Sequence, residues 1–407
     1  MSKNTMDSVS KKTPDSMSKN PMDITILAKS PCEFSAEYLQ TSGEVILVFG
    51  RSNGRQAVWF PNRGPLAVWT APPAGTILPS FDSVGKKLMF LSSSPIHRPQ
   101  VIAAGNEKQL QDESPGGIST KHLTVTSKDG MTIPITLFLP SSTHELPLVV
   151  HVYGAYGISL EGPFDPFTND FLSRGVAVAF CHIRGGGELG PQWHRDAVGR
   201  HRYRTVDDFL ACLAGLRNHP FINEERIVVT AASAGGLTAA TACLRQPTWV
   251  RGLHLVHPFI DPLSALENSA ANLASTDRYE YGDPRHDPEI RELLRKLSPM
   301  AIIEQLELRS CPLPRAWIRI SERDARVDNE SINRFCLLYR DVSISNSPGH
   351  VIQRMTPGGH LSGISLETAL EENALAHAWV LDVLQVPCKA NNSRGEDLLN
   401  AEGLCNE

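Results

Sequence analysis

Arg226-Ile-Val-Val-Thr-Ala-Ala-Ser-Ala-Gly-Gly-Leu237 is the most informative segment of this 407-residue chain. In it an apolar strand enters a turn of small residues that carries Ser233, and the chain leaves this turn as a helix. A nucleophile on such an elbow has a strained backbone, and small residues two positions away on either side let the strand and the helix approach each other. Gly235 meets this rule, and Ala231 also meets it although it carries one methyl group more than glycine. The N–H of Ala234 would then point off the helix start as an oxyanion donor.

A helix cap rich in Ser, Ala and Gly has the same local pattern, so the interpretation depends on finding a base and an acid for Ser233. Hydrolases of the α/β fold place these groups in the chain order Ser, Asp, His. The segment 315–324 is an apolar strand that opens into a loop at Asp324, and the segment 351–360 is a second strand that delivers His360 from a Pro-Gly-Gly loop. The sequence therefore predicts a triad of Ser233, Asp324 and His360 at one edge of a sheet.

Other residues compete for two of these roles. Asp328 and Glu322 are alternative acids close to Asp324, and His350 is an alternative base close to His360. We prefer His360 because it follows the end of an expected strand, whereas His350 precedes one.

Long apolar strands alternate with amphipathic stretches after residue 146. Strands are expected over 146–153, 175–182, 226–231, 251–257, 316–321 and 351–355, and helices over 206–218, 235–245, 329–340 and 367–384. A hairpin is expected around Asp129-Gly130. Continuous apolar strands joined by helices are typical of a mostly parallel sheet with helices on both faces. We therefore expect an α/β-hydrolase fold, with a catalytic domain over 122–388.

The chain before this domain has a different pattern. Between residues 24 and 121 short apolar runs are separated by Gly, Asn, Pro and Ser, which is the spacing of strands in a small antiparallel β region. Residues 1–23 are polar and contain an internal repeat of Met-Ser-Lys-Asn, so we expect a disordered leader there. The polar residues 389–407 are expected to form a loose tail.

The composition excludes several classes of protein and site. A net charge of −5 provides no cationic field for binding nucleic acid, and no stretch is apolar over the length of a transmembrane helix. The eight cysteines contain no Cys-x-x-Cys pair, and His254 and His257 would lie on opposite faces of a strand, so neither a metal site nor a cofactor is expected. Because residues 1–23 lack the apolar core of a secretory signal, we expect a cytoplasmic location.

Several further motifs follow one another along the chain: Ser127-Lys-Asp-Gly130, Tyr153-Gly-Ala-Tyr-Gly157, His182-Ile-Arg-Gly-Gly-Gly-Glu188, Gln192-Trp-His194, Ser233-Ala-Gly-Gly236, Asp324-Ala-Arg-Val327 and Pro357-Gly-Gly-His360. Together they resemble the prolyl oligopeptidase family of serine peptidases, with the strongest likeness to its prolyl endopeptidase-like and oligopeptidase B branches. The resemblance covers roughly residues 123–384. So many separated matches in one order are far more specific than any one of them.

The resemblance implies a role for each residue of the site. Ser233, Asp324 and His360 match the family's triad. Tyr153 matches the tyrosine whose hydroxyl acts together with the Ala234 N–H in the oxyanion hole.

The resemblance also implies contacts with the substrate. Arg326 matches the arginine that holds a backbone carbonyl of the substrate. Asp277 stands where prolyl oligopeptidases stack a tryptophan on the substrate proline, so a preference for proline is not expected. Asp277 and Glu280 are instead expected to pair with a basic side chain, as acidic residues of the oligopeptidase B branch do, although Tyr279 replaces one of that branch's glutamates.

Family members carry a complete β-propeller, whereas residues 24–121 would supply two or three blades. We therefore expect a truncated β-propeller-like region there. Its open sheet edges would favour protein partners or self-association.

The predicted function is that of a serine-type endo- or oligopeptidase, which acts on a short peptide or ester through an acyl-enzyme. Two alternatives stay open, both implied by the prolyl endopeptidase-like branch. One is (thio)esterase chemistry at the same triad. The other is a weakly active or non-catalytic trafficking regulator that acts by protein interaction, with peripheral association with Golgi membranes.

Overall fold

The computed structural model describes residues 34–42, 45–63, 67–81, 88–103, 115–142, 144–268, 274–344, 350–360 and 363–387. The leader expected over 1–23 and the tail expected over 389–407 lie outside these residues. Within the described ranges, no helix combines the length and the apolar character needed to span a bilayer.

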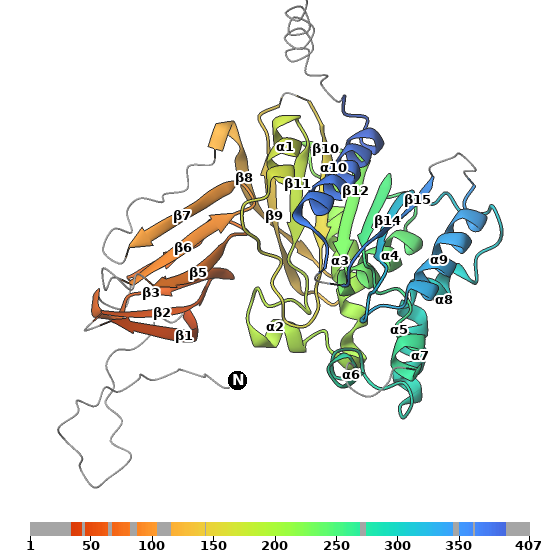
Figure 1. The fold of residues 1–407 in the computed structure, drawn as a ribbon, viewed down its shortest axis with the longest axis horizontal. Coiled ribbons are helices and arrows are strands. Elements are labelled where there is room, and N and C mark those ends of the chain that lie inside the picture. The colour runs from red at the N-terminus through yellow and green to blue at the C-terminus, as the bar shows by residue number, and fades with distance from the viewer. Residues whose placement is uncertain are drawn as a thin grey trace, which may run out of the picture.

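One eight-stranded sheet organises the larger part of the chain (Figure 1). Its strands are β8 (Ser119–Thr126), β9 (Thr132–Leu139), β10 (Leu146–Val152), β11 (Ala177–Cys181), β12 (Ile222–Ala232), β13 (Gly252–Val256), β14 (Arg315–Ser321) and β15 (Val351–Thr356). They lie in the order β15-β14-β13-β12-β10-β11-β9-β8. Neighbours from β15 to β11 are parallel, and β9 and β8 form an antiparallel hairpin at the other edge. The expected mostly parallel sheet is thus confirmed.

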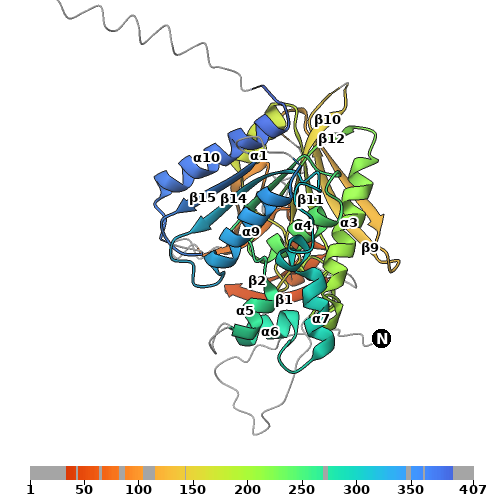
Figure 2. The same cartoon turned by 90° about the vertical axis from the view of Figure 1, so that its right-hand side faces the viewer.

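Helices cover both faces of this sheet (Figure 2). The helices α1 (Pro166–Ser173) and α10 (Leu366–Val383) pack on one face, where they cover Phe180 and Trp317. The helices α3 (Tyr203–Arg217), α4 (Ala234–Arg245) and α9 (Asn329–Val342) pack on the other face, over Val229 and Ile318. Burial on both faces explains why the inner strands are apolar throughout; all five residues of β11 are buried.

Between β13 and β14 the described residues form four helices, in the lower right of Figure 1. They are α5 (Pro262–Asn268), α6 (Ala274–Tyr281), α7 (Pro288–Leu297) and α8 (Pro299–Ile303). The helical patterns found in the sequence did not include them. Asp287 and Ser298 cap α7 and α8 with their side chains, and a proline follows each cap at the first helical position. This pairing of cap and proline is a helix-start signal that the sequence does contain.

Two antiparallel sheets precede the large sheet. The first contains β1 (Phe34–Ser42), β2 (Val45–Ser52), β3 (Arg55–Trp59) and β4 (Val68–Thr70), and the second contains β5 (Thr76–Phe81), β6 (Leu88–Ser94) and β7 (His97–Ala103). They share an apolar core that includes Phe49, Trp69 and Phe90. These sheets have the character of a propeller fragment, as expected. Arg51 of β2 ties them to the rest of the chain through an ion pair with Glu161, at 2.8 Å.

His254, in the middle of β13, makes the stability of this sheet sensitive to acid. Burial, together with the charge of Arg319, lowers the pKa of His254 to about 3, whereas an unfolded histidine titrates near about 6.5. The unfolded chain therefore binds a proton at this histidine that the folded chain does not bind. As a result, the free energy of unfolding decreases as the pH falls below about 6.5. His254→Asn keeps a polar atom for the hydrogen bond to Thr230 Oγ1, at 2.9 Å, and removes the titration. Both proteins lose unfolding free energy when the pH is lowered from 7.5 to 5.5. We expect this loss to be about 1 kcal/mol smaller in the variant than in the wild type.

Denaturant unfolding at the two pH values measures this difference. His144→Asn is the matched control because His144 is exposed. An unchanged pH dependence in the His254 variant would contradict the assignment.

Candidate active site

Ser233 is the residue that joins β12 to α4. Its backbone has φ 48° and ψ −124°, a conformation that residues other than glycine rarely adopt. The Ser233 N–H donates to the Val256 carbonyl oxygen at 2.9 Å, which holds the turn beside the end of β13. A Cβ at position 235 would lie 2.9 Å from the Val152 oxygen and 3.1 Å from the Tyr153 Cα. Glycine at 235 is therefore required for α4 to approach the end of β10, as the elbow pattern predicts.

Three side chains from separate loops form a continuous hydrogen-bonded chain at this point. Ser233 Oγ lies 2.8 Å from His360 Nε2, and His360 Nδ1 lies 2.7 Å from Asp324 Oδ2. His360 follows β15 and Asp324 follows β14, so the strand order of the sheet brings both beside the turn after β12. The side chains of His360 and Asp324 are 6% and 0% exposed, which shields both hydrogen bonds from water.

Asp324 is held as a carboxylate by its hydrogen bonds. Its other oxygen, Oδ1, accepts the backbone N–H groups of Arg326 at 2.8 Å and Val327 at 3.0 Å. Burial alone would raise the pKa of Asp324, but the bond from His360 and these two amides outweigh burial and lower the pKa below its ordinary value. The group that faces the histidine is therefore ionised at neutral pH.

The alternative acids and base are not part of the hydrogen-bonded chain of Ser233, His360 and Asp324. Asp328 accepts the N–H groups of Glu330 and Ser331 as the cap of α9. Glu322 is exposed. His350 is buried and contacts Ser343 Oγ at 2.8 Å through Nε2.

Tyr153 and the Ala234 amide lie beside Ser233, on the β10 side and at the start of α4. Ala234 is the first residue of α4, so its N–H has no partner within the helix. Among the described residues the Tyr153 hydroxyl has no hydrogen-bond partner either. Burial raises the pKa of Tyr153 against the opposing charges of Arg202 and Arg326, so the phenol keeps its proton. The Tyr153 hydroxyl and the Ala234 N–H are thus two potential donors on residues that neighbour the elbow of Ser233.

Glu280, which the resemblance led us to expect at a substrate contact, is buried and bonded to groups of the chain itself. Its side chain is 1% exposed and is fully engaged by the chain itself. Oε1 accepts from the Tyr156 N–H at 2.9 Å and from Arg202 Nη1 at 2.8 Å, and Oε2 lies 2.7 Å from His194 Nε2. The basic partner of Glu280 is therefore Arg202, and the pair anchors the loop that follows Tyr153.

Asp277 and Arg326 line a cavity of about 590 Å³ beside the loop of Asp324. Asp277 Oδ1 accepts the hydroxyl of Tyr156 at 2.8 Å, which leaves its second oxygen free of that bond. Arg326 is exposed, and its guanidinium makes no ion pair within the described part of the chain. The other acidic residues that line this cavity are Asp261, Asp324, Asp328 and Glu330, so its described lining combines several carboxylates with the one cation of Arg326.

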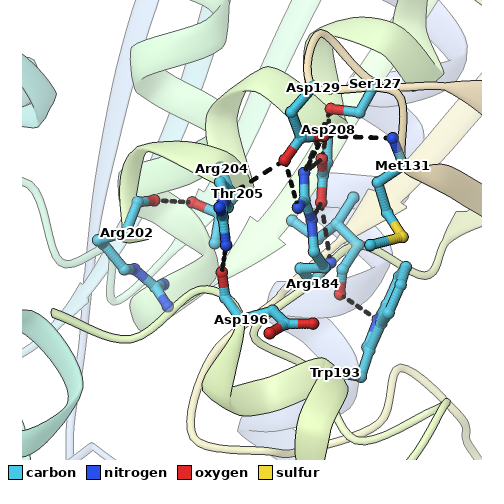
Figure 3. A network of polar contacts seen from close by, with 11 residues as sticks. Ser127, Asp129, Met131, Arg184, Trp193, Asp196, Arg202, Arg204, Thr205 and Asp208 are labelled. Carbon is cyan, nitrogen blue, oxygen red and sulfur yellow. Dashed lines mark hydrogen bonds and ion pairs between the residues drawn. The ribbon is translucent and has the colours of Figure 1, made fainter. Parts of the chain in front are cut away.

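An ion-pair network centred on the buried Arg184 lies near the loop that follows Tyr153 (Figure 3). Arg184 binds both oxygens of Asp208, at 2.6 and 2.9 Å, and both oxygens of Asp129, at 2.6 and 2.9 Å. Arg184 and Asp208 are fully enclosed. The next residue, Gly185, packs so closely on the loop that a Cβ would lie 2.2 Å from the Gly154 oxygen. Movement of Arg184 would therefore disturb the backbone that carries Tyr153.

Asp208→Ala leaves the Arg184 charge buried with one of its two carboxylates gone. We expect the unfolding free energy to fall by about 3–5 kcal/mol, the usual cost of breaking a buried pair from one side. Glu289→Gln, at an exposed pair with Arg200, is the control and should barely change the transition. Denaturant unfolding of the two variants checks this; an equal effect would show that burial does not govern the difference.

Comparisons with known proteins show the family to which the chain belongs. Residues 164–385 match the prolyl oligopeptidase family. Prolyl endopeptidase-like of Gallus gallus is 30% identical over 317 residues, which are 73% of this chain and 42% of that protein. Protease 2 of Moraxella lacunata is 23% identical over 357 residues, or 84% of this chain and 51% of that protein.

Solved structures show the same fold. Oligopeptidase B from Leishmania major superposes with a TM-score of 0.74 at 19% identity, over 87% of this chain and 52% of that one. The chain thus spans about half the length or less of the relatives it matches. Taken with the elbow and the two sheet systems, the match establishes that this chain belongs to the prolyl oligopeptidase family.

Proposed function

We propose that the chain is a serine peptidase of this family in which Ser233 is the nucleophile, His360 the general base and Asp324 the acid that orients the base. The observation that carries the proposal is the unbroken hydrogen-bonded chain from Ser233 Oγ through His360 to Asp324 Oδ2. The unit expected over 122–388 would contain the whole catalytic machinery.

In the proposed reaction, His360 Nε2 takes the proton of Ser233 as Oγ attacks the substrate carbonyl. Asp324 fixes the tautomer of His360 and stabilises the imidazolium. The oxygen of the tetrahedral intermediate becomes an anion, which the Ala234 N–H and the Tyr153 hydroxyl would bind. His360 then gives the proton to the leaving amine, and an acyl-enzyme remains on Ser233. Water, activated by His360, hydrolyses this ester and restores the serine.

The cavity next to the triad supports a short peptide as the substrate. The unpaired guanidinium of Arg326 is suited to a backbone carbonyl of the peptide, which presents oxygen lone pairs at the cavity wall. The Asp277 carboxylate lies on the same cavity and would favour a basic side chain. Since an ester places the same carbonyl in front of Ser233, a panel of amide, ester and thioester substrates with basic and neutral side chains measures the preference.

Ser233→Ala should abolish covalent labelling by a fluorophosphonate probe, because the probe reacts with an activated serine hydroxyl. Ser173→Ala, at an exposed serine of α1, is the matched control and should label as the wild type does. Labelling is followed by intact-protein mass spectrometry. Labelling of the Ser233 variant at the wild-type rate would remove Ser233 from the proposal, and no labelling of the folded wild type would favour a non-catalytic role.

Tyr153→Phe should lower kcat by about 10²–10³-fold, which corresponds to about 2.7–4 kcal/mol for the loss of one oxyanion donor. KM should change little, since the bond forms chiefly in the transition state. Tyr203→Phe serves as the control, because Tyr203 is exposed at the start of α3. Steady-state kinetics on the preferred substrate separates the two parameters. A rise in KM with unchanged kcat would assign Tyr153 to ground-state binding instead.

A further inference from the structure

His257 occupies an unusual position directly after β13. Its backbone has φ 47°, in the left-handed region that residues other than glycine and asparagine rarely enter. Its N–H donates to the Arg319 oxygen of β14 at 2.8 Å, which fixes the residue against the neighbouring strand. This strained but anchored backbone aims the imidazole at the loop that carries Asp324.

The imidazole of His257 lies against the catalytic pair without a hydrogen bond of its own at Nδ1. Nδ1 is buried, has no hydrogen-bond partner in the described part of the chain, and lies 3.8 Å from Asp324 Oδ2. The ring centroid is 5.6 Å from that of His360. The side chain is 12% exposed, so little water reaches it.

Counting the acceptor positions of Asp324 shows what His257 can do. Oδ1 takes two backbone N–H groups, and Oδ2 takes His360 Nδ1. A carboxylate offers about four lone-pair positions, two on each oxygen, so Oδ2 has one left. Among the described residues, His257 Nδ1 lies close enough to donate a hydrogen bond to this position after a short movement.

His257 is uncharged at neutral pH and carries a single N–H. The charged groups that face it are Arg319 of β14, Asp324 after β14 and His360 after β15. Burial and the Arg319 cation, followed by His360, lower the pKa of His257 to about 4, against the opposite pull of Asp324. A neutral imidazole can donate to the carboxylate without competing with His360 as a second cation.

We propose that His257 is a positioning residue of the triad, whose Nδ1–H donates to Asp324 Oδ2 and so fixes the carboxylate while moderating its attraction for protonated His360. The proposal rests on the proposed function of Ser233, Asp324 and His360. A short movement from 3.8 Å forms the bond. A carboxylate that already accepts this N–H stabilises the His360 imidazolium less, so the base loses its proton more readily.

Loss of the His257 donor should therefore shift the acidic limb of the pH–rate profile toward higher pH. A neutral-donor bond contributes about 0.5–1.5 kcal/mol, which corresponds to a shift of about 0.4–1 pH unit. A purely structural role for His257 would change the rate or the stability at all pH values and leave the midpoint where it is.

Two substitutions distinguish the effect of losing the hydrogen-bond donor from the effect of changing the backbone conformation at position 257. His257→Gly accepts the positive φ and removes the imidazole. His257→Asn also tolerates this φ and places an amide N–H where Nδ1 stands. The readout is the rate of fluorophosphonate labelling of Ser233 in the full chain between pH 5 and 9, with thermal unfolding of each variant as the check on folding.

We expect the midpoint of the acidic limb to rise by about 0.4–1 pH unit in His257→Gly and to stay within about 0.2 pH unit of the wild type in His257→Asn. Equal midpoints in all three proteins, or equal shifts in both variants, would overturn the proposal.

A second measurement keeps this test independent of catalysis. In protein labelled with ¹⁵N-histidine, the titration of His360, assigned with a His360→Asn variant, should move in the same direction in His257→Gly. If the wild type does not label with the probe but the His360 titration moves as expected, the proposed function fails and the role of His257 stands. If the wild type labels and neither midpoint moves, the role of His257 fails and the proposed function stands.

Discussion

The backbone conformation of Ser233 is the constraint on which the rest of the site depends. A residue with φ 48° costs about 1–3 kcal/mol and persists only when its surroundings hold it. Here the surroundings are the Val256 oxygen, which accepts the Ser233 N–H, and the close contact of Gly235 with the end of β10. Because these contacts come from β13 and β10, the strands on either side of β12, the position of Ser233 is fixed by the central part of the sheet rather than by its own turn.

Two buried ion pairs lie near the segment that follows Tyr153, on the side of the proposed oxyanion donors. Arg184 with Asp208 and Arg202 with Glu280 are ion pairs whose side chains are 1% exposed or less. Buried pairs contribute little net stability, because desolvation offsets their attraction, but they tolerate few alternative arrangements. Both pairs hold the segment after Tyr153, Arg184 through the packing of Gly185 on Gly154 and Glu280 through the Tyr156 N–H. We therefore expect these pairs to fix the geometry of the proposed oxyanion donors more than they stabilise the fold.

The central sheet and the meeting of Ser233, Asp324 and His360 could be predicted from the sequence for a physical reason. Parallel strands covered on both faces must be apolar along their whole length, which makes them visible without any knowledge of their neighbours. Loops that follow such strands collect at one edge, so the chain order of a serine, an acid and a histidine is informative.

Other features depend on tertiary contacts that no local pattern contains. Glu280 has the residue type of a substrate contact, yet its partner is Arg202, 78 positions away in the chain. The proximity of His257 to Asp324 follows from the pairing of β13 with β14, which a linear pattern does not specify. Three of the helices between β13 and β14, α5, α6 and α8, have 5 to 8 residues, which is too few for a helical period to develop. The longer α7 buries Ile290, Leu294 and Leu297 at helical spacing, a pattern that the sequence contains and that our expected helices did not include. The cap-and-proline pairs Asp287-Pro288 and Ser298-Pro299 are further local signals for α7 and α8.

The strand order places the proposed base, His360, directly after the strand at the edge of the described sheet. Ser233 follows β12, which has parallel neighbours on both sides, whereas His360 follows β15, which pairs with β14 alone in the described part of the sheet. Edge strands separate from a sheet at a lower free-energy cost than central ones. Fraying of β15 would withdraw the imidazole of His360 while the elbow of Ser233 stays folded, so the hydrogen-bonded chain of these residues could be lost without global unfolding.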